Sequence, residues 1–230
     1  MVEIVYKNEN FVVINKPVGI PSQKDTSLDA DAMTQAADIL KSLGEPSDLW
    51  LIHRLDRVVG GLLVFARNRA YAARLSELVQ KNLLTKEYLA VVEGEPLGGE
   101  MRDFLYHDKR TNKVFVVKEG KKGAKEARLG YRVLGSVDTP EGVLSLLEIT
   151  LYTGRTHQIR AQFASRRMPV YGDRRYGSPA SLSQGRIALW SRSIAFTLDD
   201  DISVTSMPPI DERPWEYFSV LASAAVEEEK

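Results

Sequence analysis

The sequence contains no cysteine, and histidine is scarce, with three among its 230 residues. The absence of cysteine excludes thiolate catalysis, cysteine-ligated zinc, iron–sulfur clusters and disulfide bonds. The three histidines, His53, His107 and His157, do not stand at the spacing of a recognised metal site. We therefore expect no metal centre in this protein.

Long hydrophobic runs are missing as well. No stretch approaches the roughly 18 consecutive apolar residues that a membrane-spanning helix requires. Near the N-terminus, Glu3 and Glu9 interrupt the apolar residues that an export signal would need. We expect a cytoplasmic protein that is neither exported nor inserted into a membrane.

The chain as a whole has no net charge, but individual segments of it do. The chain has 31 basic and 31 acidic residues, yet residues 101–192 hold 18 basic against 8 acidic groups, and residues 193–230 hold 2 against 9. A local excess of this size suits a phosphate backbone if the fold gathers the cations on one face. Alternatively, these lysines and arginines are ordinary solvated surface residues that bind no phosphate.

Alternating and helical hydrophobic patterns predict an α+β fold on a mixed, largely antiparallel sheet flanked by helices and loops. We assign residues 1–225 to one domain and residues 226–230 to an acidic tail. Residues 118–128, rich in lysine and glycine, are expected to form an exposed hairpin loop. Strands are expected at 3–6, 11–15, 62–66, 88–92, 114–118, 129–134, 143–151 and 187–198, and helices at 29–43, 69–84 and 155–166.

Two polar clusters could carry chemistry. In the first, Asp56 lies between Arg54 and Arg57, directly before an apolar strand. Flanking cations favour an ionised carboxylate, which suits a nucleophile or a group that stabilises positive charge. The alternative is a surface ion pair of little energetic value. The second cluster, residues 153–160, opens a predicted helix and could bind an anion, although an ordinary capped helix would look similar.

Together with three shorter elements, these clusters resemble the RluA-like family of RNA pseudouridine synthases. The resemblance runs from about residue 4 to about residue 196. Five motifs occur in the family's order: Asn15-Lys16-Pro17-Val18-Gly19, His53-Arg54-Leu55-Asp56, Lys86-Glu87-Tyr88, Gly154 to Arg160, and Pro169 to Tyr176.

The resemblance implies that Asp56 attacks the target uridine, whose base detaches, turns and rejoins through carbon 5. It further implies that Arg160 pairs with Asp56, that Tyr88 stacks on the uracil, and that Arg54 fills the gap left by the flipped base. Lys16, Arg155, His157 and Gln158 are expected to contact the RNA, which is ribosomal or transfer RNA. The family needs neither cofactor nor metal, and we expect a monomer without an S4 RNA-binding domain.

The chain departs from the family pattern at two places. Val59-Gly60 stands where most members have Thr-Ser, and Leu189-Trp190-Ser191 stands where Leu-His-Ala is usual. The paired glycines and the missing hydroxyls predict that the loop after Asp56 is less preorganised and that the enzyme is slow. Restoring Thr-Ser at positions 59 and 60 is then expected to raise the rate.

Two alternative functions follow from the same residues. The first is an RNA-binding homologue with weak or lost catalysis, since the loop after Asp56 is altered and binding needs only the basic surface and Tyr88. The second is a hydrolase with paired carboxylates, for which Asp173 is the candidate second acid.

Overall fold

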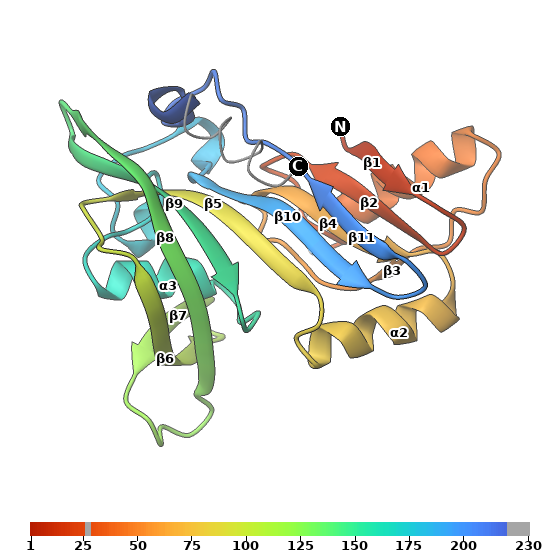
Figure 1. Ribbon diagram of the computed structural model, residues 1–230, viewed down its shortest axis with the longest axis horizontal. Helices are drawn as coiled ribbons and strands as arrows, with labels where there is room; N and C mark the ends of the chain where they lie inside the picture. The colour runs from red at the N-terminus through yellow and green to blue at the C-terminus, as the bar shows by residue number, and fades with distance from the viewer. Residues whose placement is uncertain (26–28, 220–230) are drawn as a thin grey trace. The chain divides into compact units, whose positions relative to one another are not determined.

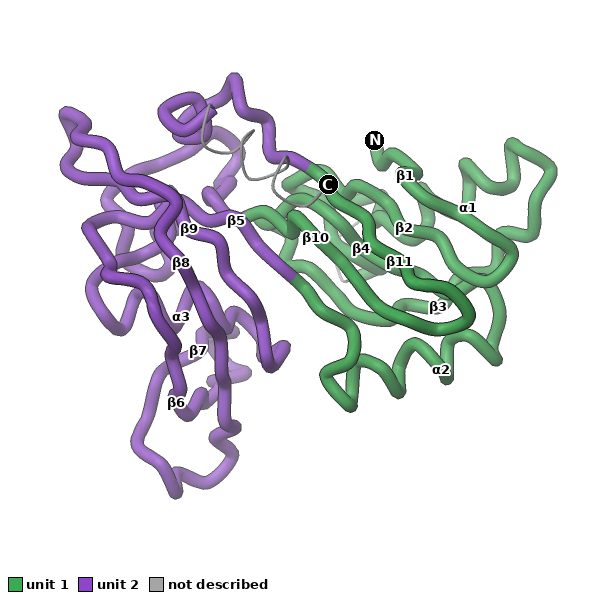
Figure 2. The backbone as a smooth tube through the Cα atoms, viewed as in Figure 1, with its two compact units in different colours: residues 1–86, 190–206 green, residues 87–189, 207–230 purple. Residues whose placement is uncertain are grey.

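The computed structural model describes residues 1–25 and 29–219 (Figure 1). The chain forms two compact units (Figure 2). Unit 1 comprises Met1–Lys86 with Trp190–Ser206, and unit 2 comprises Glu87–Leu189 with Met207–Lys230. The expected tail at 226–230 lies outside the described residues, and the assignment of 1–225 to one catalytic domain stays a prediction.

Unit 1 is built on a mixed sheet. Strands β1 (Glu3–Lys7), β2 (Phe11–Lys16) and β4 (Gly60–Ala66) pair antiparallel in that order, and β10 (Leu189–Thr197) joins β4 in parallel. The two-residue strand β3 (Trp50–Leu51) pairs with β4, and β11 (Asp201–Thr205) pairs with β10.

Two capped helices accompany this sheet. In α1 (Ala32–Ser42), the Asp31 side chain accepts from the backbone N–H of Thr34 at 3.0 Å. In α2 (Arg69–Gln80), the Asn68 side chain accepts from Tyr71 in the same way at 2.9 Å. Such caps satisfy N–H groups that the first helical turn leaves without a partner.

The core of unit 1 lies between the sheet and α2. Every residue of β4 is buried, which explains its uninterrupted apolar sequence. Alternate residues of three strands pack with Leu75 of α2 and with Leu84, namely Phe11, Val13, Leu62, Val64, Ala66, Ile194 and Phe196.

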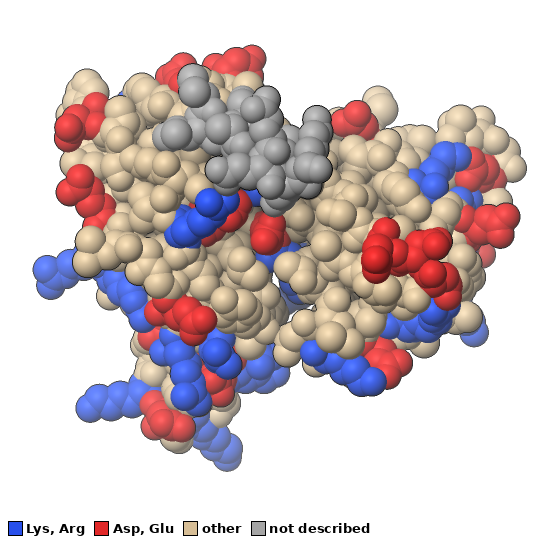
Figure 3. All heavy atoms as spheres, in the orientation of Figure 1, with Lys and Arg blue, Asp and Glu red and all other residues tan. Residues whose placement is uncertain are grey.

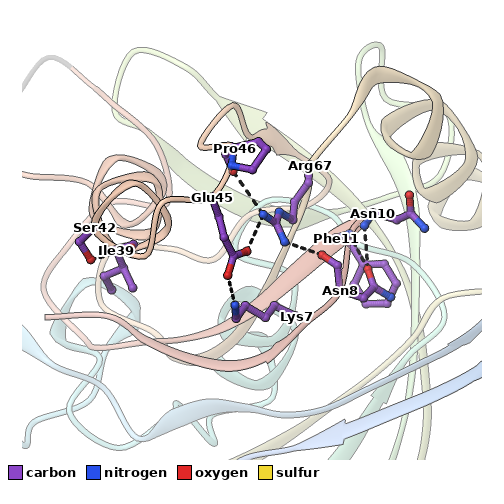
Figure 4. Close-up of polar contacts among 9 residues, drawn as sticks. All are labelled: Lys7, Asn8, Asn10, Phe11, Ile39, Ser42, Glu45, Pro46 and Arg67. Atoms are coloured by element: carbon purple, nitrogen blue, oxygen red, sulfur yellow. Dashed lines mark hydrogen bonds and ion pairs between the residues drawn. The ribbon is translucent and has the colours of Figure 1, made fainter.

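The far end of β4 is fixed by Arg67, whose side chain is 7% exposed (Figure 4). Its guanidinium donates to the Asn8 carbonyl oxygen at 2.6 Å and to the Glu45 carboxylate at 2.7 Å. Glu45 also pairs with Lys7, and this bond is the main cause of the lowered pKa of the Glu45 carboxyl. The cluster ties the β1–β2 turn to the end of the strand.

Unit 2 is built on antiparallel strands in the order β5-β9-β8-β6-β7. Helix α3 (Gln158–Ser165) packs on it through Ala161, against Leu105, Val114, Ala127 and Tyr176. The strands are β5 (Thr85–Glu93), β6 (Gly99–Asp108), β7 (Lys113–Val117), β8 (Lys125–Thr139) and β9 (Gly142–Leu151). Three 3-10 helices follow at Arg174–Tyr176, Ser183–Gly185 and Trp215–Phe218.

The predicted α+β class with its mixed, largely antiparallel pairing is confirmed. The predicted hairpin at 118–128 is wrong, because β7 and β8 both pair with β6. Their connection passes from one side of β6 to the other beside Phe104 and Leu105. Helix α3 begins at Gln158 rather than 155, because His157 has a left-handed backbone with φ 49°. No helix among residues 1–25 and 29–219 is long and apolar enough to cross a membrane.

Candidate active site

The segment that carries Asp56, residues 52–59, leaves β3 and re-enters the sheet as β4; we call it the Asp56 loop. Its first anchor is His53, whose Nε2 accepts the backbone N–H of Val64 at 3.3 Å. Burial, with a smaller effect from the charge of Lys86, lowers the pKa of His53 to about 3. The ring is therefore neutral, with its proton on Nδ1 and its Nε2 available as an acceptor.

The middle of the Asp56 loop is held by the segment after β2. The buried hydroxyl of Ser22 accepts from the Leu55 N–H at 3.0 Å and donates to the Leu55 carbonyl oxygen at 2.8 Å. The Gly19 N–H donates to the Arg57 carbonyl oxygen at 2.8 Å. The backbone on both sides of Asp56 is thus fixed by hydrogen bonds from outside the loop.

Two cations near Asp56, Arg57 and Lys16, have identified partners. Arg57 pairs with Asp29 at 2.7 Å and approaches Asp25 at 3.7 Å. Lys16, at the end of β2, is fully buried and donates to the carbonyl oxygens of Pro17 and Ile20 in the segment that follows. Burial lowers the pKa of Lys16 to about 7, although Asp56 acts in the opposite direction and raises it.

The start of β4 leaves no space for side chains. A Cβ atom on Gly60 would lie 2.2 Å from Cζ3 of Trp190, and one on Gly61 would lie 2.2 Å from the Ser191 carbonyl oxygen. Gly61 also has φ +107°, which favours glycine. The expectation that these glycines loosen the loop is therefore wrong. They allow β4 and β10 to approach closely, and restoring Ser at position 60 would create a collision.

The second polar cluster, in unit 2, is held together by hydrogen bonds to the Gln158 side chain. Its side-chain oxygen accepts from the Thr153 hydroxyl at 2.8 Å and from the Arg155 N–H at 3.0 Å, and its nitrogen donates to the Arg128 carbonyl oxygen at 3.0 Å. Gln158 is buried, whereas Arg155 is exposed and donates through Nε to the Glu126 carbonyl oxygen.

Arg160, on α3, forms a buried two-bond contact with Asp173. Its Nε donates to Oδ2 at 2.6 Å and its Nη2 to Oδ1 at 3.0 Å, and the two side chains are 6% and 1% exposed. The guanidinium carbon lies 5.0 Å from the centre of the Tyr176 ring. Sequence reasoning treated Asp173 as part of a turn, or as a second acid, and missed this role. The one signal in the sequence was that the motif with Asp173 directly follows the motif with Arg160.

Tyr176 connects His157 to β7. Its hydroxyl accepts the Val114 N–H at 2.8 Å and forms a hydrogen bond with His157 Nδ1 at 2.9 Å. The His157 ring and the Tyr176 ring also pack edge to face, with their centres 5.7 Å apart.

The structure distributes the predicted site residues over both units. Unit 1 holds Arg54 and Lys16 with Asp56, and unit 2 holds the remaining five. Tyr88 is buried on β5, opposite Ile149 of β9. Lys16 and Gln158 are buried and form hydrogen bonds inside the protein, and their expected contact with RNA stays a prediction. Among the described residues, no three His, Asp or Glu side chains gather as a metal site would require.

A family model described as RNA pseudouridylate synthase matches residues 10–165. The chain belongs to this family. It is 33% identical over 177 residues to ribosomal large subunit pseudouridine synthase C of Rickettsia conorii, covering 76% of this chain and 56% of that protein. An uncharacterised RNA pseudouridine synthase of Haemophilus influenzae is 30% identical over 218 residues, covering 90% and 88%.

The fold of this family member agrees with a solved relative. Human RNA pseudouridylate synthase domain containing 4 superposes with a TM-score of 0.75 over 97% of this chain and 92% of that one, at 23% identity. The chain spans a little over half the length of the Rickettsia protein, 56%. The resemblance drawn from the five motifs is confirmed.

Exposed cations gather on unit 2 of this family member. Blue spheres are frequent where Figure 1 draws the ends of β6, β7 and β8, with acidic groups among them (Figure 3). The exposed basic residues of this part of the chain are Arg102, Lys109, Arg110, Lys118, Lys121, Lys122, Lys125 and Arg128.

Proposed function

We propose that this protein is an RNA pseudouridine synthase that isomerises specific uridines of structured ribosomal or transfer RNA in the cytoplasm, with Asp56 as the nucleophile. The observation that carries the proposal is the fixed backbone around Asp56. Ser22 holds Leu55 on one side and Gly19 holds Arg57 on the other. A nucleophile positioned in this way meets the requirement for covalent catalysis.

In the proposed reaction, the Asp56 carboxylate forms a covalent bond to the target nucleotide and the N1 glycosidic bond breaks. The uracil turns, its C5 bonds to the ribose, the proton at C5 leaves and N1 gains a proton. The aspartate is released unchanged, so the product is an isomer of the substrate. No electrons are exchanged, and this chain's own residues supply the covalent step.

The other residues have distinct proposed roles. Arg160 donates a charge-assisted hydrogen bond to Asp56 while Asp173 fixes the plane of its guanidinium. Tyr88 stacks on the turning uracil, and Arg54 takes the space of the flipped base. Stacking and space filling offset the few kcal/mol that base flipping costs.

Arg155 and His157 are proposed to contact the RNA, from the loop before α3. For Lys16 and Gln158 we propose positioning roles, since both are buried and form hydrogen bonds to the neighbouring loop segments. The alternative of a binding protein without catalysis rested on a loosened loop after Asp56. The hydrogen bonds on Leu55 and Arg57 and the packing at Gly60 favour catalysis instead.

The deciding experiment replaces the nucleophile. Asp56→Asn keeps the side-chain shape but removes the carboxylate, so we expect no pseudouridine formation and RNA affinity within several-fold of the wild type. Tritium release from RNA carrying 5-tritiated uridine measures the reaction. Asp38→Asn, an exposed carboxylate on α1, is the matched control and should keep full activity. Wild-type turnover by Asp56→Asn would exclude the proposed role.

The target uridine can be found in cells. Sequencing RNA with a pseudouridine-specific chemical stop, from cells with and without this gene, should show one or a few sites that disappear with the gene. Those sites should return with wild-type protein and not with Asp56→Asn. Identical stop profiles in both cell types would contradict the proposed activity.

A further inference from the structure

Trp190 and Gly60 are matched to one another across two neighbouring strands. They stand opposite each other in the parallel pair of β10 and β4. Trp190 is 8% exposed, and its indole N–H donates to the Ser206 hydroxyl at 3.2 Å. A Cβ atom at position 60 would lie 2.2, 2.7 and 3.1 Å from Cζ3, Cε3 and Cη2 of the indole. All three atoms belong to the six-membered ring, which therefore occupies the space of a side chain at position 60.

We infer that Trp190 is a positioning residue for the Asp56 loop, and that it acts as a coupled pair with Gly60. The two departures from the family pattern are then one compensated change. This inference rests on the proposed synthase activity.

The pair fixes the end of the Asp56 loop. Gly60 is the first residue of β4, and the preceding Val59 donates its N–H to the Asp56 carbonyl oxygen at 3.0 Å. Ser22 fixes Leu55 on the other side of Asp56. Asp56 thus lies in a short turn between two contact points, the Ser22 hydroxyl at Leu55 and the Trp190 indole at Gly60.

The arrangement replaces hydrogen bonding with packing. A glycine in a strand is unfavourable because it has no side chain to pack and loses more backbone entropy. Here the ring of Trp190 packs on the bare backbone of Gly60 and supplies the contact area of a large aromatic residue. Val59, which is 2% exposed, needs no hydroxyl partner in this environment.

A double-mutant cycle tests the coupling. Gly60→Ser places atoms inside the indole, so we expect the single-turnover rate at saturating RNA to fall about a hundredfold. Trp190→His removes the six-membered ring and leaves a void, and should reduce the rate about tenfold. The combined variant should recover to within about tenfold of the wild type, because the serine then fills the void.

Two controls separate positioning from general damage. The RNA concentration for half-maximal rate should change little in all three variants, since the substrate-binding surface is kept. Trp50→His removes a tryptophan at the opposite end of β4, beside Ala66, and its effect should simply add to that of Gly60→Ser. If Gly60→Ser does not fold, Gly60→Ala takes its place, with the same pattern expected against Trp190→His.

The outcomes distinguish the two hypotheses. An active wild type with additive effects of Gly60→Ser and Trp190→His would overturn the coupling and leave the synthase function standing. A wild-type rate in Gly60→Ser would do the same. A wild type that forms no pseudouridine in any cellular RNA would overturn the proposed function itself, and the positioning role with it.

Discussion

Asp173 is the residue that directs Arg160, because its two carboxylate oxygens bind two guanidinium nitrogens at 2.6 and 3.0 Å. Breaking a buried ion pair of this kind leaves an uncompensated charge and costs about 3–5 kcal/mol. The contact also uses the planar geometry that distinguishes arginine from lysine.

Arg160→Lys should therefore impair catalysis although it keeps the positive charge. A lysine cannot make both bonds to Asp173, so we expect the single-turnover rate to fall by roughly a hundredfold, with RNA affinity changed far less. Arg166→Lys is the matched control, because Arg166, directly after α3, pairs with Asp103 of β6 but is 34% exposed. An Arg160→Lys enzyme as fast as the wild type would show that the two-bond contact between Arg160 and Asp173 is not required.

His53 makes the free energy of unfolding depend on pH. Its pKa of about 3 in the folded protein lies below the ordinary value of 6.5, because the ring is buried and Lys86 is near. Between these values the unfolded chain binds a proton that the folded protein does not. The free energy of unfolding therefore falls as the pH drops from about 6.5 toward about 3.

His53→Gln should reduce this acid sensitivity. The glutamine amide oxygen can accept the Val64 N–H but has no proton to gain, so the loss of stability between about pH 7 and about pH 4.5 should shrink. Urea unfolding at the two pH values measures it. His107→Gln, at a half-exposed ring bonded to Asn112, is the matched control. An equal pH dependence in His53→Gln would refute the buried neutral state.

At the scale of elements, the Asp56 loop is stabilised by residues far from it in the sequence. Ser22 lies 33 positions from Leu55, and both of its hydrogen bonds are buried. Ser22→Ala leaves a buried N–H and carbonyl without this partner, which should lower the free energy of unfolding by about 1–3 kcal/mol. We expect a slower single-turnover rate as well, because the backbone next to Asp56 loses a fixed point.

Ser42→Ala is the matched control for Ser22→Ala. Ser42 ends α1, and its exposed hydroxyl donates to the Ile39 carbonyl oxygen at 2.7 Å. Its loss should change neither the rate nor the free energy of unfolding appreciably. If Ser22→Ala matched Ser42→Ala in both measurements, the serine would not hold the loop.

The elements predicted from the sequence were those with a strong local pattern. The buried β4 and helix α2 are examples. Strand β6 was missed because only Met101 and Leu105 are buried on it, so its other face gives no apolar alternation. Strand β3 has two residues, too few for any pattern. Both β7 and β8 pair with β6. A short stretch of sequence does not contain the information that decides this pairing.

The same limit applied to the candidate site. The resemblance to the family named Asp56 and Arg160 as predicted site residues, and each stands in a dense polar cluster. The partner of Arg160 and the collision between Gly60 and Trp190 depend on distances in space. Two consecutive glycines in a sequence suggest a flexible backbone, whereas here they allow two strands to approach closely.

At the scale of the whole molecule, the neutral net charge hides a basic segment. Residues 101–192 carry 18 basic and 8 acidic groups, and several of the cations are exposed around the β7–β8 crossover. If this surface meets phosphates, RNA affinity should fall linearly with the logarithm of salt concentration, because each contact releases counterions. Affinity that stays constant from low to physiological salt would show that these cations do not meet the RNA.

The crossover lysines test where those contacts lie. Replacing Lys121, Lys122 and Lys125 together with alanine removes up to three phosphate contacts, so the salt slope should decrease by about two to three. The single-turnover rate at saturating RNA should stay near the wild-type value, since these residues lie away from the nucleophile in the sequence and on another element. Filter binding across a salt series gives the slope.

The matched control removes the same charge from unit 1. Lys24, Lys41 and Lys81 are exposed and belong to residues 1–100, where acidic groups outnumber basic ones, 14 to 11. Replacing these three with alanine should leave the slope nearly unchanged. Equal slopes for both triple variants would mean that RNA responds to total charge alone. A smaller slope for the crossover variant only would place the phosphate backbone along the β7–β8 connection.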